Sequence, residues 1–485
     1  MTPKYDLVAI AKQTMIAKGL QPDYPQAVTD QLKGINAPAA LPNLEDSRKL
    51  LWCSIDNDDS KDLDQLTYAQ DEANGQISLW VAVADVDALV AKDSPIDNHA
   101  QVNTTTVYTP SKNFAMLPEK LSTNLTSLNE KQERAAVVVK MLMNPSGDIV
   151  DASIHHATVY NYAQLTYNAV GAWLEGKGAI PEKVAAIKGL EENLTKQSLA
   201  AQILRKKRYE LGALTLETIE AVPVFQGEEI VGLEPATTNK AHQLIEHFMI
   251  ATNTSIARYF AKAKIPSLRR VVRVPKRWDR IVEVAQEKGE TLPAQPDSKA
   301  LDAFLIKMRD RDPEAFPDLS LTIVKLLGSG EYVVEVPGDN PVGHFGLALK
   351  EYTHSTAPNR RYPDVITQRQ IKNSLWTHVS LYQTAELEKL AYHCTVQEDA
   401  AAKVERQMRK SAAAILLSNQ IGTTFQGIIT GSSDKGTWVR IFKPATEGRI
   451  IKNGKALDVG DKVQVKLVGV DVEKGYIDFA FVQKI

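Results

Sequence analysis

Five aspartates fall within nine positions of one short segment, SIDNDDSKDLDQL (54–66). Carboxylates this close repel one another, so a folded protein keeps them together only where something offsets the repulsion. Hard divalent cations do this, because they take oxygen ligands and neutralise several carboxylates at once. The segment is therefore a candidate metal site, and its acidic members are Asp56, Asp58, Asp59, Asp62 and Asp64.

A calcium loop and a solvated polar turn are two simpler interpretations of this segment. An EF-hand loop needs Gly at its sixth position and Glu at its twelfth. Counted from Asp56, these positions hold Lys61 and Thr67, which excludes the calcium loop. The solvated polar turn stays open as the alternative to a metal site.

Apolar residues on both sides of the aspartates favour a segment that is held in place. The run 50–55 precedes them, and Leu63 and Leu66 anchor the far side. Carboxylates gathered at a strand end suit magnesium, which retains waters that a phosphate can replace. Two such ions can activate water and stabilise the leaving oxygen when a phosphodiester is displaced. The segment thus predicts a metal site for phosphate chemistry.

The rest of the chain alternates between runs that favour strands and runs that favour helices. Short helical periodicity marks residues 1–45, and residues 385–417 lack Pro and Gly, as in a long terminal helical hairpin. After Gln420, short strands are cut by glycine turns, which is the signature of a small β-barrel. The pattern predicts an α+β fold, with strands and helices followed by the barrel. The strand-like runs are 49–55, 76–86 and 135–143, and the amphipathic helical runs are 163–176, 198–212 and 241–263.

Composition limits the classes of protein that this chain can belong to. Its 485 residues carry a net charge of −2, so any nucleic-acid site must be a local patch. Only two cysteines are present, Cys53 and Cys394, which argues against a disulfide framework or a zinc site. No signal peptide is apparent, and no run approaches about 18 apolar residues, so no membrane partner is expected. A reducing cytoplasm is the predicted compartment.

Four ordered blocks resemble the ribonuclease II (RNB) family. The aspartate segment resembles the family signature, with Asp at three matching positions, and three further blocks lie at 107–134, 244–253 and 344–369. The resemblance implies an RNB catalytic domain over residues 46–419, with a mixed sheet and packed helices, after a short helical segment at 1–45. The cold-shock barrels that usually begin this family are not expected in a segment so short and helical.

Residues 420–485 resemble the OB-fold RNA-binding domain of the ribosomal protein S-one type. The matching features are Gly422, Gly427, Gly436, the pair Glu447-Gly448 and the Val-Gly-Asp triplet at 459–461. The resemblance implies a separate RNA-binding domain at the C-terminal end.

The family resemblance implies a magnesium-dependent exoribonuclease, with manganese as a second candidate ion. Such an enzyme hydrolyses single-stranded RNA processively from the 3′ end and releases nucleoside 5′-monophosphates. Here Gln65 replaces the fourth family aspartate and is a weaker ligand, although Asp58 or Asp59 could substitute. A catalytically inactive RNA-binding protein on the same fold is therefore the alternative. A DNA-directed nuclease is a third candidate, because contacts to the 2′-hydroxyl cannot be read from sequence.

The resemblance also implies roles for particular residues of the acidic site. Asp56, Asp62 and Asp64 would hold the metal, and Asp62 and Asp64 would act in catalysis. Arg360 would contact the 3′-terminal phosphate and stabilise charge, which suits the planar, bidentate guanidinium. Its neighbour Arg361 is expected to be structural.

Other residues are predicted to bind the RNA chain. By resemblance, Tyr108 and Tyr167 grip bases by stacking, which tolerates any sequence, with core packing as the alternative. Seven basic residues against one acid in 264–280, Arg270 among them, predict a patch along the RNA path.

For several positions two interpretations stay open. Asp85 is either a residue of the site or a strand-end residue that caps a turn. His354 is expected to be a hydrogen-bonded core histidine, and Glu405 lies either near the metal or on a helix surface. Phe425 and Trp438 are either stacking residues or barrel core.

Overall fold

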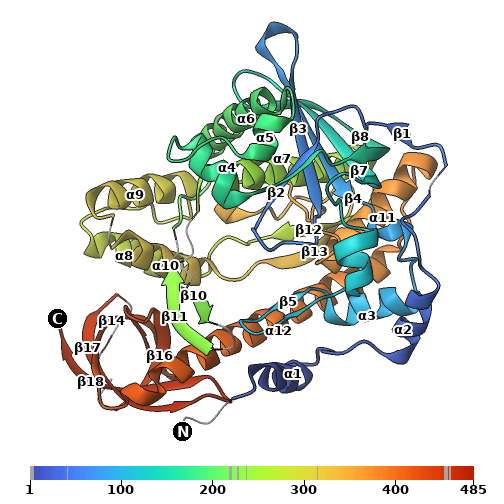
Figure 1. The fold of residues 1–485 in the computed structure, drawn as a ribbon. Coiled ribbons are helices and arrows are strands. Elements are labelled where there is room, and N and C mark those ends of the chain that lie inside the picture. The colour runs from blue at the N-terminus through green and yellow to red at the C-terminus, as the bar shows by residue number, and fades with distance from the viewer. Residues whose placement is uncertain are drawn as a thin grey trace.

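A mixed sheet of seven strands dominates one half of the computed structural model (Figure 1). The strand order is β1-β8-β7-β4-β3-β2-β9. The pairs β1–β8 and β2–β9 are parallel, and the other neighbours are antiparallel. The strands are β1 (Glu45–Asp46), β2 (Cys53–Asp56), β3 (Gln65–Asp71), β4 (Ile77–Ala84), β7 (Glu133–Met143), β8 (Ile149–Tyr160) and β9 (Ala163–Thr166). The structure describes residues 5–40, 42–217, 221–226, 229–235, 238–313, 315–452, 457 and 460–485.

Both faces of the central strands are covered, which explains why the runs 76–86 and 135–143 are so apolar. Along β4, Leu79 and Val81 pack against the helices, while Ala82 packs on the opposite face with Trp52 and Leu63. The mixed sheet and packed helices agree with the predicted fold class. The helices on the first face are α4 (Tyr167–Leu174), α5 (Glu182–Ala186), α6 (Leu190–Glu210) and α7 (Lys240–Ala263).

A second core forms where two long helices meet a two-stranded ribbon below the sheet (Figure 1). The helix α12 runs unbroken for 34 residues, so the hairpin predicted within 385–417 is wrong. A run of helix-favouring residues without Gly or Pro contains nothing that would end a helix. The elements of this core are α2 (Gln26–Lys33), η2 (Val86–Ala88), α3 (Pro95–Asn103), β12 (Ser267–Val271), β13 (Glu331–Glu335), α11 (Tyr362–Thr377) and α12 (Thr384–Leu417).

Three helices stand to one side of these layers and share a small core of their own (Figure 1). They are α8 (Trp278–Glu287), α9 (Ser298–Arg311) and α10 (Phe316–Leu327). Among the described residues, no helix combines the length and the apolar character needed to cross a bilayer. The remaining short elements are η1 (Ala73–Gly75), β5 (Val107–Tyr108), β6 (Asn113–Phe114), η3 (Leu121–Leu125), β10 (Ala221–Gln226), β11 (Glu229–Pro235), η4 (Phe345–Leu347) and η5 (Ser418–Gln420).

The C-terminal strands close into a five-stranded barrel of order β14-β15-β16-β18-β17, as the OB-fold prediction requires. Gly448 is needed there, because a Cβ at this position would overlap the Phe479 ring and the Ile477 carbonyl. The strands are β14 (Thr424–Ser433), β15 (Gly436–Ile441), β16 (Thr446–Lys452), β17 (Lys462–Asp471) and β18 (Tyr476–Lys484).

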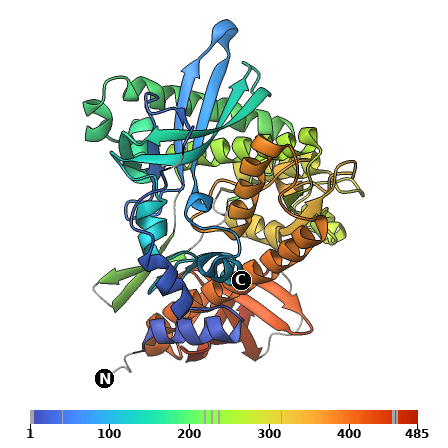
Figure 2. The ribbon, with the colours of Figure 1, turned by 90° about the vertical axis from the view of Figure 1, so that its right-hand side faces the viewer.

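The barrel is fastened to the helices by charged contacts as well as by apolar packing. Glu447 of β16 receives Lys325 of α10 at 2.9 Å and Lys410 of α12 at 3.2 Å. Arg440 of β15 pairs with Asp318 of α10. The helix α1 (Leu7–Ala17) packs on α12 in the same apolar cluster as the barrel interior, beneath the rest of the molecule (Figure 2).

Candidate active site

The aspartate segment leaves β2 at Asp56 and enters β3 at Gln65, and its far end is firmly anchored. Leu63 is 1% exposed, and its backbone N–H donates to Ser127 Oγ at 2.9 Å. The Ser127 hydroxyl donates in turn to the Lys61 carbonyl at 2.8 Å. The predicted anchoring at Leu63 and Leu66 is confirmed, since both are buried. The segment is therefore a fixed loop and not a loose polar turn.

The described structure places Asp64 against the loop that begins α11. Asp64 is 2% exposed, and one of its carboxylate oxygens accepts a hydrogen bond from the Asn359 backbone N–H at 2.9 Å. Arg360 Nε lies 3.3 Å from the other oxygen. Asp56 and Asp62 are half-buried near the same guanidinium, whose charge acts on both. The fold thus places all three aspartates within electrostatic range of the arginine that the sequence singled out.

These carboxylates are short of partners. Burial raises the pKa of Asp64 to about 7, and Arg360 and the Asn359 N–H oppose that shift only in part. Burial also raises the pKa of Asp56 and of Asp62, and their mutual repulsion adds to the shift at Asp56. Buried charges without full compensation are costly. A cation bound at this cluster would therefore stabilise it.

The donor set fits a hard dication in chemistry, since every nearby acidic group offers oxygen. Within the described ranges, however, no three His, Cys, Asp or Glu side chains already stand close enough to share one ion. An ion would have to draw Asp56, Asp62 and Asp64 together. Asp58 and Asp59 are exposed, and Asp58 accepts a hydrogen bond from Asn168 at 2.5 Å.

Both predicted RNA-binding tyrosines lie beside this cluster. Tyr108 in β5 is 39% exposed, and the three aspartates and Arg360 act electrostatically on its hydroxyl. Tyr167 opens α4, and Asp56 and Arg360 act on its hydroxyl. Burial raises the pKa of both phenols, so they stay protonated at neutral pH.

Arg361 and Arg270 both form ion pairs with acidic residues of the protein. Arg361 is partnered with Asp364 at 2.8 Å, as expected of a structural residue. Arg270 forms an ion pair with Glu398 and lies 4.8 Å from the centre of the Tyr332 ring. His354 accepts or donates a hydrogen bond at the Tyr332 hydroxyl (2.7 Å), which agrees with a hydrogen-bonded core histidine.

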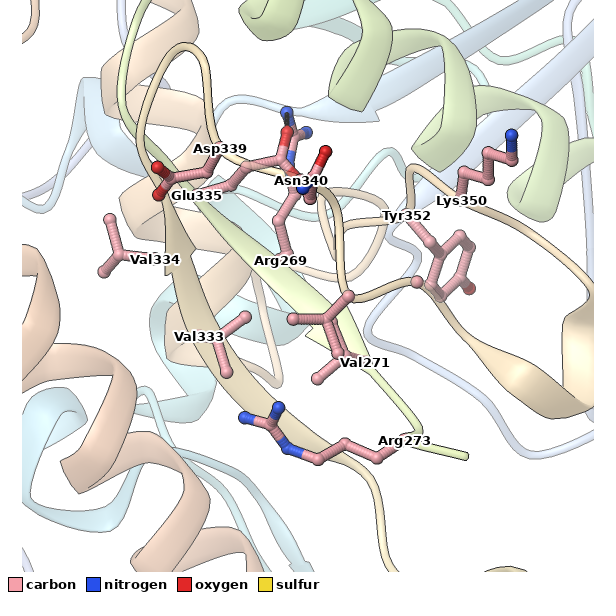
Figure 3. A pocket seen from close by; sticks show the side chains of 12 residues that line it. Arg269, Val271, Arg273, Val333, Val334, Glu335, Asp339, Asn340, Lys350 and Tyr352 are labelled. Atoms are coloured by element: carbon pink, nitrogen blue, oxygen red, sulfur yellow. Dashed lines mark hydrogen bonds and ion pairs between the residues drawn. The ribbon is translucent and has the colours of Figure 1, made fainter. Parts of the chain in front are cut away.

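The basic stretch 264–280 does not form one free patch. Besides Arg270, three of its arginines have acidic partners, and these pairs are Arg269–Glu335, Arg273–Glu331 and Arg280 with Glu283 and Glu287. Arg269 and Arg273 line a cavity of about 210 Å³ beside β12, together with Val271, Val333 and Tyr352 (Figure 3). Successive strand residues face opposite sides, so this cavity opens on the side of β12 away from Arg270.

Asp85 has a structural role at the end of β4, where it caps η2. Its side chain accepts a hydrogen bond from the Ala88 N–H and so caps η2. It also pairs with His156 at 2.6 Å and with Lys372 of α11 at 2.8 Å. Burial acts to raise the Asp85 pKa, but these two partners lower it overall.

The remaining open positions are also placed. Glu405 on α12 accepts a hydrogen bond from the Tyr108 backbone N–H at 2.9 Å, so it supports the tyrosine's strand. Phe425 packs edge-on against Phe479 at 6.3 Å and belongs to the barrel interior. Trp438 lies half-buried over Gly431 on the barrel wall.

Sequence reasoning missed three residues that shape the site. Asn359 holds Asp64 through its backbone, and its side-chain oxygen receives the Thr126 hydroxyl at 2.6 Å. Ser127 fixes the aspartate loop. His242 stacks on Tyr167 with ring centroids 4.0 Å apart. All three contacts join distant parts of the chain, so the only local signal was the position of Asn359 next to Arg360.

Comparisons with known proteins agree with the architecture. Ribonuclease R of Escherichia coli (strain K12) is 31% identical over 95% of this chain, and the chain spans 60% of that relative. Ribonuclease R of Aquifex aeolicus is 29% identical over the whole chain, which spans 71% of it. In fold, the chain is similar to Mycoplasma genitalium RNase R in its apo form, with a TM-score of 0.87, 24% identity, and coverage of 98% of this chain and 78% of that one.

A further solved structure, yeast Ssd1, is described as a pseudonuclease and shares the fold at a TM-score of 0.72 and 18% identity, covering 96% of this chain and 59% of that one. Residues 423–482 match the C-terminal S1 domain of RNase II-type exonucleases. Residues 44–377, more than half of the chain, match the RNB domain family. The chain therefore belongs to the RNB family.

Proposed function

We propose that this chain is a magnesium-dependent hydrolytic exoribonuclease that trims single-stranded RNA processively from the 3′ end to nucleoside 5′-monophosphates. The observation that carries the proposal is the convergence of Asp56, Asp62 and Asp64 on Arg360 in a buried, under-compensated cluster. The family membership and the ribonuclease R relatives support the same reaction class.

In this proposal, Asp56, Asp62 and Asp64 hold magnesium, with manganese as the alternative ion. The ion, when bound, supplies an activated water and charge stabilisation at the leaving oxygen. Asp62 and Asp64 orient the site, and the Asn359 N–H holds Asp64 in place. Arg360, 42% exposed, is free enough on its outer side to bind an RNA phosphate in a bidentate way.

The two tyrosines would grip RNA next to the cluster. Tyr108 is 39% exposed, and aromatic–base stacking contributes about 1–3 kcal/mol per base whatever the sequence. Arg270 stays a predicted RNA contact, but it would have to leave Glu398 first. The barrel at 424–484 would hold the incoming strand, in keeping with its match to an S1 domain.

The alternative, an RNA-binding protein without catalysis, rests on Gln65 alone. Gln65 lies half-buried at the first position of β3, where it can still offer a carbonyl oxygen. The presence of the other three aspartates with Arg360 favours the enzyme. We also propose the division into 1–45, 46–419 and 420–485, which limited proteolysis can test, and a reducing cytoplasmic setting in keeping with the unpaired Cys53 and Cys394.

A trimming assay tests the proposal. RNA with a 3′ overhang is incubated with protein and magnesium, and released nucleotides are separated by chromatography. Wild type should release 5′-monophosphates, and Asp64→Asn should not, while its RNA affinity stays within severalfold. A matched DNA oligomer distinguishes an RNA enzyme from a DNA-directed one. Intact RNA with wild type in both magnesium and manganese would leave the binding-protein alternative in place.

A further inference from the structure

Tyr167 is held from two sides by the start of α7. Its ring lies on the His242 imidazole, with centroids 4.0 Å apart and planes 14° from parallel. Its backbone carbonyl accepts a hydrogen bond from Asn239 Nδ2 at 2.9 Å. Asn239 fits closely against Gly171 of α4, where any Cβ would overlap its side chain. The start of α7 is therefore shaped to receive the start of α4.

His242 serves two purposes that can be separated. Its Nδ1 accepts a hydrogen bond from the Asn239 backbone N–H at 3.3 Å, which completes a capping box at the N-terminus of α7. Glu or Gln usually fills this third helical position of a capping box. Neither of these side chains would present a ring to Tyr167. Capping therefore does not require a histidine here, whereas the stack on Tyr167 requires an aromatic ring.

The stacked pair borders the acidic cluster. Tyr167 directly follows Thr166, which is the register partner of Asp56 in the β2–β9 strand pair, and the charges of Asp56 and Arg360 act on the Tyr167 hydroxyl. A ring that is already fixed loses less freedom when a ligand packs against it. Parallel aromatic pairs also favour one ring orientation over others. A fixed Tyr167 is therefore prepared to receive a flat or ring-shaped part of a nucleotide.

We propose that His242 is a positioning residue that holds Tyr167 in the orientation that grips a nucleotide of single-stranded RNA at the aspartate cluster. The inference rests on the proposed function, because it takes RNA as the ligand. It assigns to His242 a role in substrate binding and none in the chemical step.

Two substitutions separate the stack from the cap. His242→Gln keeps a capping side chain and removes the ring, while His242→Phe keeps a ring and removes the cap. RNA affinity is measured by fluorescence anisotropy in EDTA, where no cleavage occurs. We expect His242→Gln to weaken binding by about three- to tenfold, the effect of one aromatic contact. His242→Phe should bind within about twofold of wild type.

Thermal unfolding should rank the same variants in the opposite order. His242→Phe loses the cap and should unfold a few degrees lower, whereas His242→Gln should unfold close to wild type. With magnesium, His242→Gln should raise KM and leave kcat unchanged. A merely structural role would lower RNA affinity and stability together in both variants, which would overturn the proposal.

A double-mutant cycle tests whether His242 acts through Tyr167. In a Tyr167→Ala background, His242→Gln should weaken RNA binding no further, because the ring that it orients is gone. Additive losses would overturn the proposal, as would equal affinities of His242→Gln and wild type. If wild type binds RNA with this pattern and does not cleave it, the proposed function fails while the inference stands. If wild type binds no RNA, both fail.

Discussion

Asp64 is buried and Glu447 is half-buried, and their surroundings shift the pKa values of the two carboxylates in opposite directions. At Asp64, burial raises the pKa to about 7, and Arg360 at 3.3 Å only partly opposes it. At Glu447, burial acts in the same sense, but Lys325 at 2.9 Å and Lys410 at 3.2 Å lower the pKa to about 2. The Thr430 hydroxyl adds a hydrogen bond to Glu447 at 2.7 Å.

The difference separates a carboxylate whose charge the protein itself compensates from carboxylates that we propose to bind a cation. Glu447 joins β16 to α10 and α12, and the two lysines of these helices compensate its charge. Asp85 is of the same kind, with His156 and Lys372 as its partners. The cluster at Asp64 lacks such compensation and so destabilises the fold unless a cation or a changed protonation state relieves it. The number of compensating partners therefore distinguishes the two regions better than residue type does.

The largest effect should come from removing Arg360, the cation nearest Asp64. Arg360→Met should lower kcat for monophosphate release by about 100-fold or more, because one preorganised charge at a developing anion is worth that much. Arg360→Lys should recover only part of the loss, since a lysine lacks the bidentate fork. Arg309→Gln, on the remote helix α9, serves as the matched control and should keep wild-type kcat. Full activity of the Arg360→Met enzyme would contradict a role of Arg360 in the reaction.

The next largest effect concerns stability. Glu447→Gln leaves two lysines without their counter-charge and should lower the free energy of unfolding by about 2–3 kcal/mol. Asp64→Asn removes an under-compensated charge and, in EDTA, should leave stability unchanged or raise it by up to about 1 kcal/mol. Urea unfolding followed by tryptophan fluorescence measures both. Equal destabilisation by the two substitutions would contradict the view that Glu447 is compensated and Asp64 is not.

The stabilisation by Glu447 should depend on pH. Its folded pKa, about 2, lies below the unfolded value for Glu, so its contribution is full at neutral pH and is lost as pH falls through the folded pKa. The gap in stability between wild type and Glu447→Gln should begin to close below about pH 4.5, and about half of it should be gone by pH 3. Urea titrations of both proteins at a series of pH values measure the gap. A gap that stays constant down to pH 3 would show that Glu447 contributes through packing alone.

The smallest effect tests how far the acidic cluster tolerates more charge. Gln65→Asp adds a carboxylate next to Asp64 and should tighten magnesium binding by about three- to tenfold. Without metal, the same substitution should cost about 1 kcal/mol of stability through like-charge repulsion. Isothermal calorimetry and urea unfolding in EDTA measure the two effects. Gln65→Glu is the control, because its longer side chain places the carboxylate differently. Unchanged magnesium affinity in Gln65→Asp would mean that position 65 does not reach the ion.

Local patterns predicted much of the fold, and the errors arose where distant segments meet. The strands at 76–86 and 135–143 and the closed barrel follow from residue type and spacing. The basic patch predicted along the RNA path at 264–280 stays a prediction, and most of its arginines pair with acidic residues of β13, α8 and α12 that its local sequence does not reveal. A sequence shows a cluster of charges but not which opposite charges fold against it.

Acidic groups gathered between apolar anchors at a strand end can be recognised from the sequence alone, because they are neighbours along the chain, as Asp56, Asp62, Asp64 and Leu63 are. The contact of Arg360 with Asp64 and the stack of His242 on Tyr167 depend on how the helices and sheets pack. Arg360 is 296 positions from Asp64, and His242 is 75 positions from Tyr167. Contacts across such separations form only when whole helices and sheets pack together, so local propensity cannot predict them.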